Sequence, residues 1–181
     1  MPPRHPARRT GLPRLWLMTD ERMGEALWDA LARLPKGSGV VFRHHATPAA
    51  ERRALFARVL KVARARRLMV LSAGGRLPGA AGSHNRRPDR GLYSRSAHDR
   101  GELIAARRAG ADVAFVSPVF ATRSHPGARA LGPVRLGLLI RDAGLPLVAL
   151  GGMTGPRARR LAALRLHGWA AIDAWSGVAG R

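Results

Sequence analysis

Short apolar runs alternate with longer amphipathic segments along this chain. Six runs are clear, at 15–18, 40–42, 68–71, 114–116, 146–150 and 169–172. Weaker candidates lie near His84 and at 92–94. Runs of apolar residues without polar alternation are typical of strands that are covered on both faces, so they predict a parallel sheet.

The segments between the runs have the residue spacing of one-faced helices. We expect helices over 24–34, 48–67, 97–110, 132–144 and 155–168. In the second of these, Leu55, Val59 and Val62 recur at three- and four-residue spacing, with arginines between them. Strands that alternate with helices in this way, eight of them when the weaker candidates are counted, favour a (β/α)₈ barrel.

The chain has 181 residues, whereas ~250 is typical of such a barrel. The glycine-rich segment 73–82 is too short for a full helix, and the sequence stops soon after the eighth run. The expectation is therefore an α/β fold, a compact (β/α)₈ TIM barrel with shortened helices and no full C-terminal helix. We expect one domain over 13–181 after a flexible basic tail over 1–12; an open, doubly wound sheet is the alternative.

Composition excludes several classes of protein. There is no cysteine, hence no disulfide framework and no zinc-thiolate site. No apolar run approaches the roughly 18 residues of a membrane span, and the N-terminal segment lacks the apolar stretch of a signal peptide. We expect a soluble cytoplasmic protein without a membrane partner.

The formal net charge of +21 comes almost entirely from arginine, since the only lysines are Lys36 and Lys61. A basic surface attracts polyanions, but these arginines are scattered from end to end. No RNA-binding aromatic motif or helix-turn-helix pattern is present. We therefore do not expect a nucleic-acid partner, although polyanion binding stays as an alternative.

Polar residues follow the ends of the expected strands, where a barrel carries its functional groups. Neighbouring residues on a strand point to opposite faces, so Arg43 and His45 are expected to share the mouth of the barrel, without His44. Two sites have a structural alternative: Thr19 and Asp20 as the cap of the first helix, and Ser96 as the cap of the helix near His98. The whole set is Thr19, Asp20, Arg43, His44, His45, Ser72, His84, Asn85, Arg86, Ser94, Ser96, His98, 117–127, Gly151, Gly152 and Asp173.

Four segments in this order and spacing resemble the thiamine phosphate synthase and TenI family, most strongly over 94–175. They are LWLMTD, SRSAHDRGELIAARRAGADVAFVSPVFATRSHPGARALG, PLVALGGMT and GWAAIDAW. The resemblance implies a barrel, usually a homo-oligomer, that acts on thiazole phosphate in thiamine biosynthesis. The family's synthase joins an aminopyrimidine diphosphate to thiazole phosphate and releases diphosphate with the help of Mg²⁺.

The chain departs from the synthase at the positions that bind diphosphate and metal. Val41, Arg43 and His45 stand where the family has Gln-x-Arg-x-Lys, so that only the arginine is retained. Ser72 and Ala73 replace a metal-binding Asn-Asp pair, and after the fourth strand the chain offers Asp89 behind two arginines. We expect no metal ligand and no certain cofactor; Mg²⁺ would be needed only if synthase activity is retained.

The other family activity, tautomerisation of a thiazole, moves a proton. Pro118 stands at the position of the TenI histidine and cannot transfer one, so His125 and His84 are the candidate acid–base residues. Together with Arg43 they are the predicted catalytic residues. Two glycines whose backbone N–H groups can approach an anion precede a helix start near Gly155. The predicted substrate- or phosphate-binding residues are His45, Thr122, Ser124, Gly151 and Gly152.

One residue does not suit a phosphate site. Asp173 replaces a serine that the family often has, and a carboxylate beside a phosphate is unfavourable unless an arginine intervenes. The expected partner is a thiazole phosphate or a related small anion, and a homo-oligomer is plausible. The alternative is a catalytically degenerate barrel that binds a ligand or regulates.

Overall fold

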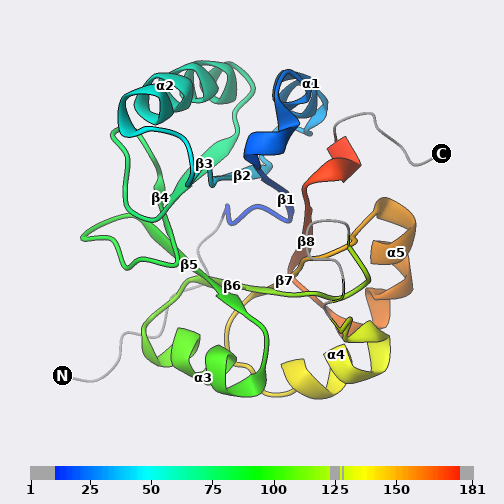
Figure 1. The fold of residues 1–181 in the computed structure, drawn as a ribbon. Helices are drawn as coiled ribbons and strands as arrows, with labels where there is room; N and C mark the ends of the chain where they lie inside the picture. The colour runs from blue at the N-terminus through cyan, green and yellow to red at the C-terminus, as the bar shows by residue number, and fades with distance from the viewer. Residues whose placement is uncertain (1–10, 123–126, 128, 176–181) are drawn as a thin grey trace.

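The computed structural model describes residues 11–122, 127 and 129–175 of the chain. Within these residues eight parallel strands close into one barrel in the order of the sequence (Figure 1). The last strand pairs with the first, Leu15 opposite Trp169, so the predicted barrel is confirmed and the open-sheet alternative is wrong. The strands are β1 (Leu15–Met18), β2 (Gly39–Phe42), β3 (Met69–Ala73), β4 (Gly82–His84), β5 (Leu92–Ala97), β6 (Val113–Val116), β7 (Leu147–Ala149) and β8 (Gly168–Ala171).

Helices cover the barrel between most of the strands, and each is shorter than the segment predicted for it. The region 155–168 is not one helix: the α-helix ends at Arg160, a 3₁₀ turn follows, and Arg165 ends that turn in a left-handed conformation (φ 50°) ahead of β8. The α-helices are α1 (Ala26–Arg33), α2 (Ala49–Ala65), α3 (Arg100–Arg108), α4 (Gly132–Ile140) and α5 (Gly155–Arg160). The described residues also form the 3₁₀ turns η1 (Glu21–Met23), η2 (Ala162–Leu164) and η3 (Asp173–Trp175).

Two connections carry no helix at all. The described segments 74–81 and 85–91 join β3 to β4 and β4 to β5 as turns, which leaves β4 without a helix beside it in Figure 1. Ser72 holds the first of these turns, since its hydroxyl donates to Gly75 O and accepts from Leu77 N at 2.9 Å. These two turns explain how the chain is shorter than a typical barrel.

Alternate strand residues point inward and fill the barrel. Trp16 is completely buried there, with its ring edge-on to Phe115 at 5.3 Å and its indole N–H bonded to Pro13 O at 2.8 Å. Gly39 lies opposite Trp16 in the strand register, and a side chain at this position would collide with the indole ring. The interior is therefore a packed core rather than a pore.

The flank after β8 is closed by a single turn. Trp175 of η3 stacks on Trp169 of β8, with 5.1 Å between ring centroids and 17° between ring planes. η3 contacts α1, so it occupies the place beside β8 where a further helix would pack (Figure 1). Among the described residues this agrees with the prediction of no full C-terminal helix.

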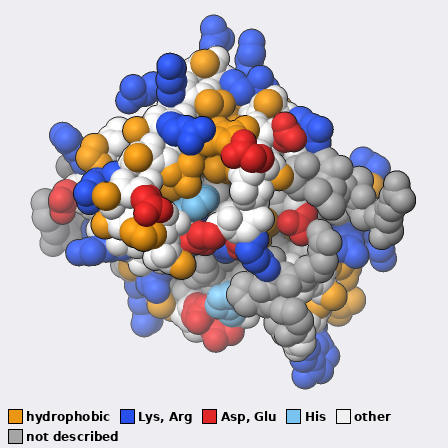
Figure 2. Space-filling view, turned by 45° about the horizontal axis from the view of Figure 1, so that its top comes forward, with side chains coloured by type: hydrophobic (Ala, Val, Ile, Leu, Met, Phe, Trp, Pro, Cys, Tyr) orange, Lys and Arg blue, Asp and Glu red, His pale blue; other side chains and the backbone are white. Residues whose placement is uncertain are grey.

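Arginine and lysine side chains are spread around the face seen in Figure 2 and do not gather in one patch. Hydrophobic, acidic and histidine side chains lie between them. In the part of the chain that the structure describes, none of the helices has the length and apolar character that crossing a membrane requires.

Candidate functional site at the mouth of the barrel

Arg43 and His84 come together at the C-terminal ends of the strands. Val41 of β2 and Phe115 of β6 belong to the barrel interior. Arg43 follows Val41 by two residues and so leaves the strand on the same side. His84, the last residue of β4, packs edge-on against Phe115 at 5.4 Å. Arg43 is close enough to lower the pKa of His84, which places both at the mouth.

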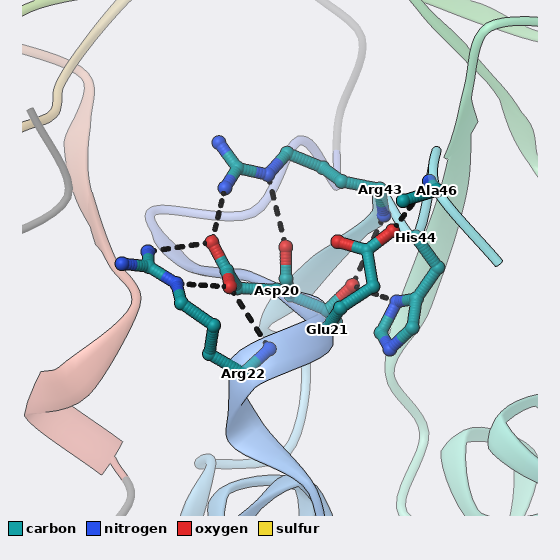
Figure 3. A network of polar contacts seen from close by, with 7 residues as sticks. Asp20, Glu21, Arg22, Arg43, His44 and Ala46 are labelled. Carbon is teal, nitrogen blue, oxygen red and sulfur yellow. Dashed lines mark hydrogen bonds and ion pairs between the residues drawn. The ribbon is translucent and has the colours of Figure 1, made fainter.

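Arg43 is held by the end of β1 (Figure 3). Its backbone N–H donates to Thr19 Oγ1 at 3.0 Å, its Nε to Thr19 O at 2.9 Å, and its Nη2 to Asp20 Oδ2 at 3.0 Å. The remaining guanidinium nitrogen, Nη1, points away from these partners in Figure 3. One side of the guanidinium is thus held by hydrogen bonds, and Nη1 on its other side is turned away from Thr19 and Asp20.

Asp20 binds a second arginine as well. Arg22 donates from Nε to Oδ1 at 2.7 Å and from Nη2 to Oδ2 at 2.8 Å, the two-pronged geometry that an arginine makes with a carboxylate. These bonds from Arg22 hold the pKa of Asp20 at about 2, below its ordinary 3.8. Asp20 also accepts from Arg22 N and caps η1, as its structural alternative predicted.

Asp173 interacts with the same pair. Asp20 and then Asp173 raise the pKa of Arg22. Alternating charges therefore lie just after β2 (Arg43), just after β1 (Asp20), on η1 (Arg22) and on η3 (Asp173). Asp173 is therefore within electrostatic range of an arginine, Arg22.

The two histidines after Arg43 separate as predicted. His44 is buried on the outside of the barrel, stacked on Phe42 at 4.5 Å and bonded to Thr19 Oγ1 at 3.0 Å, and its burial lowers its pKa. His45 is exposed, and its ring lies beside Gly74 of the β3–β4 turn. Because His45 also lowers the pKa of His84, it belongs to the mouth.

His84 is enclosed by a network that the sequence analysis did not identify. Its Nδ1 lies 2.9 Å from Ser94 Oγ and its Nε2 3.1 Å from Ser96 Oγ. The Ser94 hydroxyl also donates to Ser83 O at 3.4 Å, so its one proton is used there and its oxygen accepts from the Nδ1–H of His84. Nε2 of His84 then carries no proton and accepts from the Ser96 hydroxyl. The alternation of Ser94 and Ser96 on β5 was the available signal, since residues two apart point the same way.

Burial, followed by the charges of Arg43 and His45, lowers the pKa of His84 to about 3. The imidazole is therefore neutral near pH 7: it has no imidazolium proton to give, and it is only a weak proton acceptor. Ser96 Oγ stands at its accepting nitrogen. Proton exchange between His84 and a ligand must pass through, or displace, the Ser96 hydroxyl.

The loops after β6 and β7 pack against each other on the other side of the mouth. Phe120 N donates to Gly151 O at 3.0 Å, while Arg157 donates to Gly152 O and lies over the Phe120 ring at 5.1 Å. Side chains at the two glycines would meet this neighbouring loop, 2.8 Å from Pro118 Cα at Gly151 and against Ala121 O at Gly152. Loop packing thus accounts for these glycines without an anion.

We expect Gly152→Ala to lower the free energy of unfolding by about 2 kcal/mol, because φ is +59° there and a left-handed residue with a Cβ costs about 1–2 kcal/mol before any collision. Urea unfolding measures the change. Gly155→Ala is the matched control, since its new Cβ would meet only Arg159 Nη1 at 3.9 Å. Equal losses in the two variants would contradict this explanation of Gly152.

The remaining predicted residues are placed as follows. Thr122 is half-buried on the loop after β6, whereas Ser124 and His125 lie outside the described residues. The cap predicted at Ser96 is wrong: Asp99 caps α3 by accepting from Glu102 N at 2.8 Å, and Ser96 lies one turn too early, on β5. His98 binds Ser117 O through Nδ1 at 2.8 Å.

The carboxylates at the mouth do not suit Mg²⁺, which needs oxygen ligands that no other cation has taken. Asp20 is bonded to two arginines, and Ser72 is used within its own turn. Asp89 lies exposed on the segment 85–91. No group of three His, Cys, Asp or Glu that could hold a metal occurs in the described ranges.

Two sequence comparisons point to one family. The sequence model of a family described as thiamine monophosphate synthase matches residues 84–175, just over half of the chain. Thiamine-phosphate synthase from Geobacillus kaustophilus (strain HTA426) is 40% identical over 82 residues, 44% of this chain. The match spans 37% of that protein's length.

Solved structures resemble the chain over nearly its whole length. A thiamine phosphate pyrophosphorylase from Pyrococcus furiosus matches with a TM-score of 0.78 and 22% identity, covering 96% of this chain and 91% of that one. One from Bacteroides thetaiotaomicron has a TM-score of 0.57 and 17% identity, with 88% and 83% covered. At these identities the two structures support the barrel fold.

Proposed function

This chain belongs to the thiamine monophosphate synthase family, and from that premise we propose that it binds thiazole phosphate, or a closely related small anion, at the C-terminal mouth of its barrel. Its place is thiamine biosynthesis or thiazole salvage. A cytoplasmic location is part of the same proposal, because the family is biosynthetic.

The fixed guanidinium of Arg43 is the observation that carries the proposal. Two hydrogen bonds, from Nε to Thr19 O and from Nη2 to Asp20 Oδ2, set its orientation, and its Nη1 points away from them (Figure 3). A planar guanidinium with unused donors suits a phosphate group. His45 and His84 lie on the same side of the barrel, which supports a binding site on the axis between them.

Residues that could exchange a proton are present in a restricted form. His84 Nε2 lies 3.1 Å from Ser96 Oγ, but a pKa of about 3 makes the ring a weak base at neutral pH, where a tautomerase needs a base whose pKa lies closer to 7. The synthase reaction is less well supported, because Ser72, Ala73 and the arginine-bound Asp20 supply no carboxylate for a cation. That observation favours a second candidate function, a barrel that binds the ligand without turnover.

Calorimetric titration with thiazole phosphate and thiamine phosphate tests the binding. We expect dissociation constants below millimolar for the wild type, and an affinity about 10–100-fold weaker for Arg43→Met, since a hydrogen bond to a charged group contributes about 1.5–3 kcal/mol. Arg58→Met is the matched control, because Arg58 lies over Trp28 on the outside of the barrel at 4.6 Å. Failure of both ligands to bind the wild type would contradict the proposal.

Two further measurements separate the alternatives. Turnover with the two synthase substrates, or with a thiazole tautomer, would distinguish an enzyme from a barrel that only binds. Steeply salt-dependent binding of nucleic acid would favour the polyanion alternative, although the arginines are spread widely in Figure 2. The predicted homo-oligomer can be checked by light scattering.

A further inference from the structure

We propose that this barrel binds its phosphate ligand without a divalent cation, and that Asp20 and Arg22 act as positioning residues that hold the Arg43 guanidinium in the cation's place. The inference rests on the proposed function and specifies which positive charge balances the ligand. It reverses the expectation for a synthase, in which Mg²⁺ assists.

The first step concerns the carboxylates on the strands around Arg43. Both carboxylate oxygens of Asp20 accept hydrogen bonds from the guanidinium groups of Arg22 and Arg43. Glu21 turns toward the β2–α2 connection, where Oε1 accepts from Ala46 N at 2.8 Å (Figure 3). Asp173 interacts with Arg22. A cation would have to displace an arginine from Asp20 before it could bind that carboxylate.

The second step concerns the charge inside the mouth. His84 serves as a probe, because it is nearly fully buried between β4, β5 and β6. The charges that act on it are those of Arg43 and His45, and both disfavour its protonation. No carboxylate of the described residues offsets them. A site with this field attracts an anion and repels a divalent cation.

The third step is the rigidity of the arginine. The backbone N–H, Nε and Nη2 of Arg43 donate to Thr19 and Asp20, just after β1, and Arg22 in turn donates to both carboxylate oxygens of Asp20. A long side chain normally loses rotamer freedom when it binds a ligand. Here that cost is met on folding, so the guanidinium is already oriented for a phosphate.

The decisive experiment is titration of the full chain with inorganic diphosphate, the group that a synthase releases with the help of Mg²⁺, in excess EDTA and again in millimolar Mg²⁺, with thiazole phosphate titrated in the same two buffers. We expect the two dissociation constants for diphosphate to agree within about threefold. Diphosphate binding that is absent without Mg²⁺, or that tightens more than about tenfold with it, would overturn the inference, while thiazole phosphate binding would leave the proposed function standing. No binding of either ligand in either buffer would overturn both.

Variants test the positioning role. Asp20→Asn should weaken thiazole phosphate binding about tenfold while affinity for the unphosphorylated thiazole alcohol stays unchanged, a difference that general unfolding would not produce. Arg22→Gln, at an exposed residue, should cause a smaller loss of the same kind. Asp29→Asn, on the exposed face of α1, is the matched control. Unchanged or tighter phosphate binding in Asp20→Asn would overturn the positioning role.

Discussion

Replacing Trp16 by alanine is expected to lower the free energy of unfolding by about 3–5 kcal/mol, the range for removing a large aromatic from a core. Trp16 is wholly buried inside the barrel, edge-on to Phe115 at 5.3 Å, and it fills the space that Gly39 leaves open. The strands around it form a closed ring, so neighbouring backbone cannot collapse into the cavity. Urea unfolding followed by circular dichroism measures the loss.

A double-mutant cycle isolates the contact. Gly39→Ala alone should be strongly destabilising, because its Cβ would collide with the indole ring, and the same change should cost much less in the Trp16→Ala background. Trp28→Ala is the control of equal size, since Trp28 is only half-buried on the outer surface under Arg58. Comparable losses at Trp16 and Trp28, or additive costs in the cycle, would contradict this account of the interior.

The sequence allowed the barrel to be predicted because its strands are nearly pure apolar runs. Val113–Val116 and Leu147–Ala149 are completely or almost completely buried, and a strand covered on both faces needs no polar alternation. Strand lengths were less predictable. β5 continues through Ser94, Arg95 and Ser96 to Ala97, since serine hydroxyls can face the interior where His84 satisfies them.

The mouth was predictable in position but not in its bonding. Alternation along β2 correctly separated Arg43 from His44. The bonds of Arg43 to Thr19 and Asp20, however, depend on which residues of β1 lie level with it, and local sequence does not encode that register. The sequence also left two explanations for Gly151 and Gly152. A close approach to an anion and a close approach to a neighbouring loop both require glycine, and in the structure both glycines pack closely against the loop after β6.

His84 should make the protein less stable on acidification between about pH 6.5 and pH 3. The pKa of His84 in the folded protein, about 3, lies below the ordinary 6.5. In this interval the unfolded chain therefore binds a proton at His84 and the folded chain does not. Stability therefore rises with pH across the interval and is lost as pH falls. At about 1.4 kcal/mol per pH unit, the loss from neutral pH to pH 4 is about 3 kcal/mol.

His84→Gln should remove the part of the loss that is due to His84 and leave the part due to His44, whose pKa burial also lowers; His98→Gln, at an exposed histidine, is the control. Urea unfolding at a series of pH values from 7 to about 4 compares the three proteins; the loss attributable to Asp20 falls at lower pH, between 3.8 and about 2. Nitrogen NMR of the wild type gives a second readout: the His84 ring should stay neutral down to about pH 4, with its proton on Nδ1. A His84 resonance that titrates near pH 6.5 would show that the ring is open to solvent, and with it the Ser94–His84–Ser96 network would have to be abandoned.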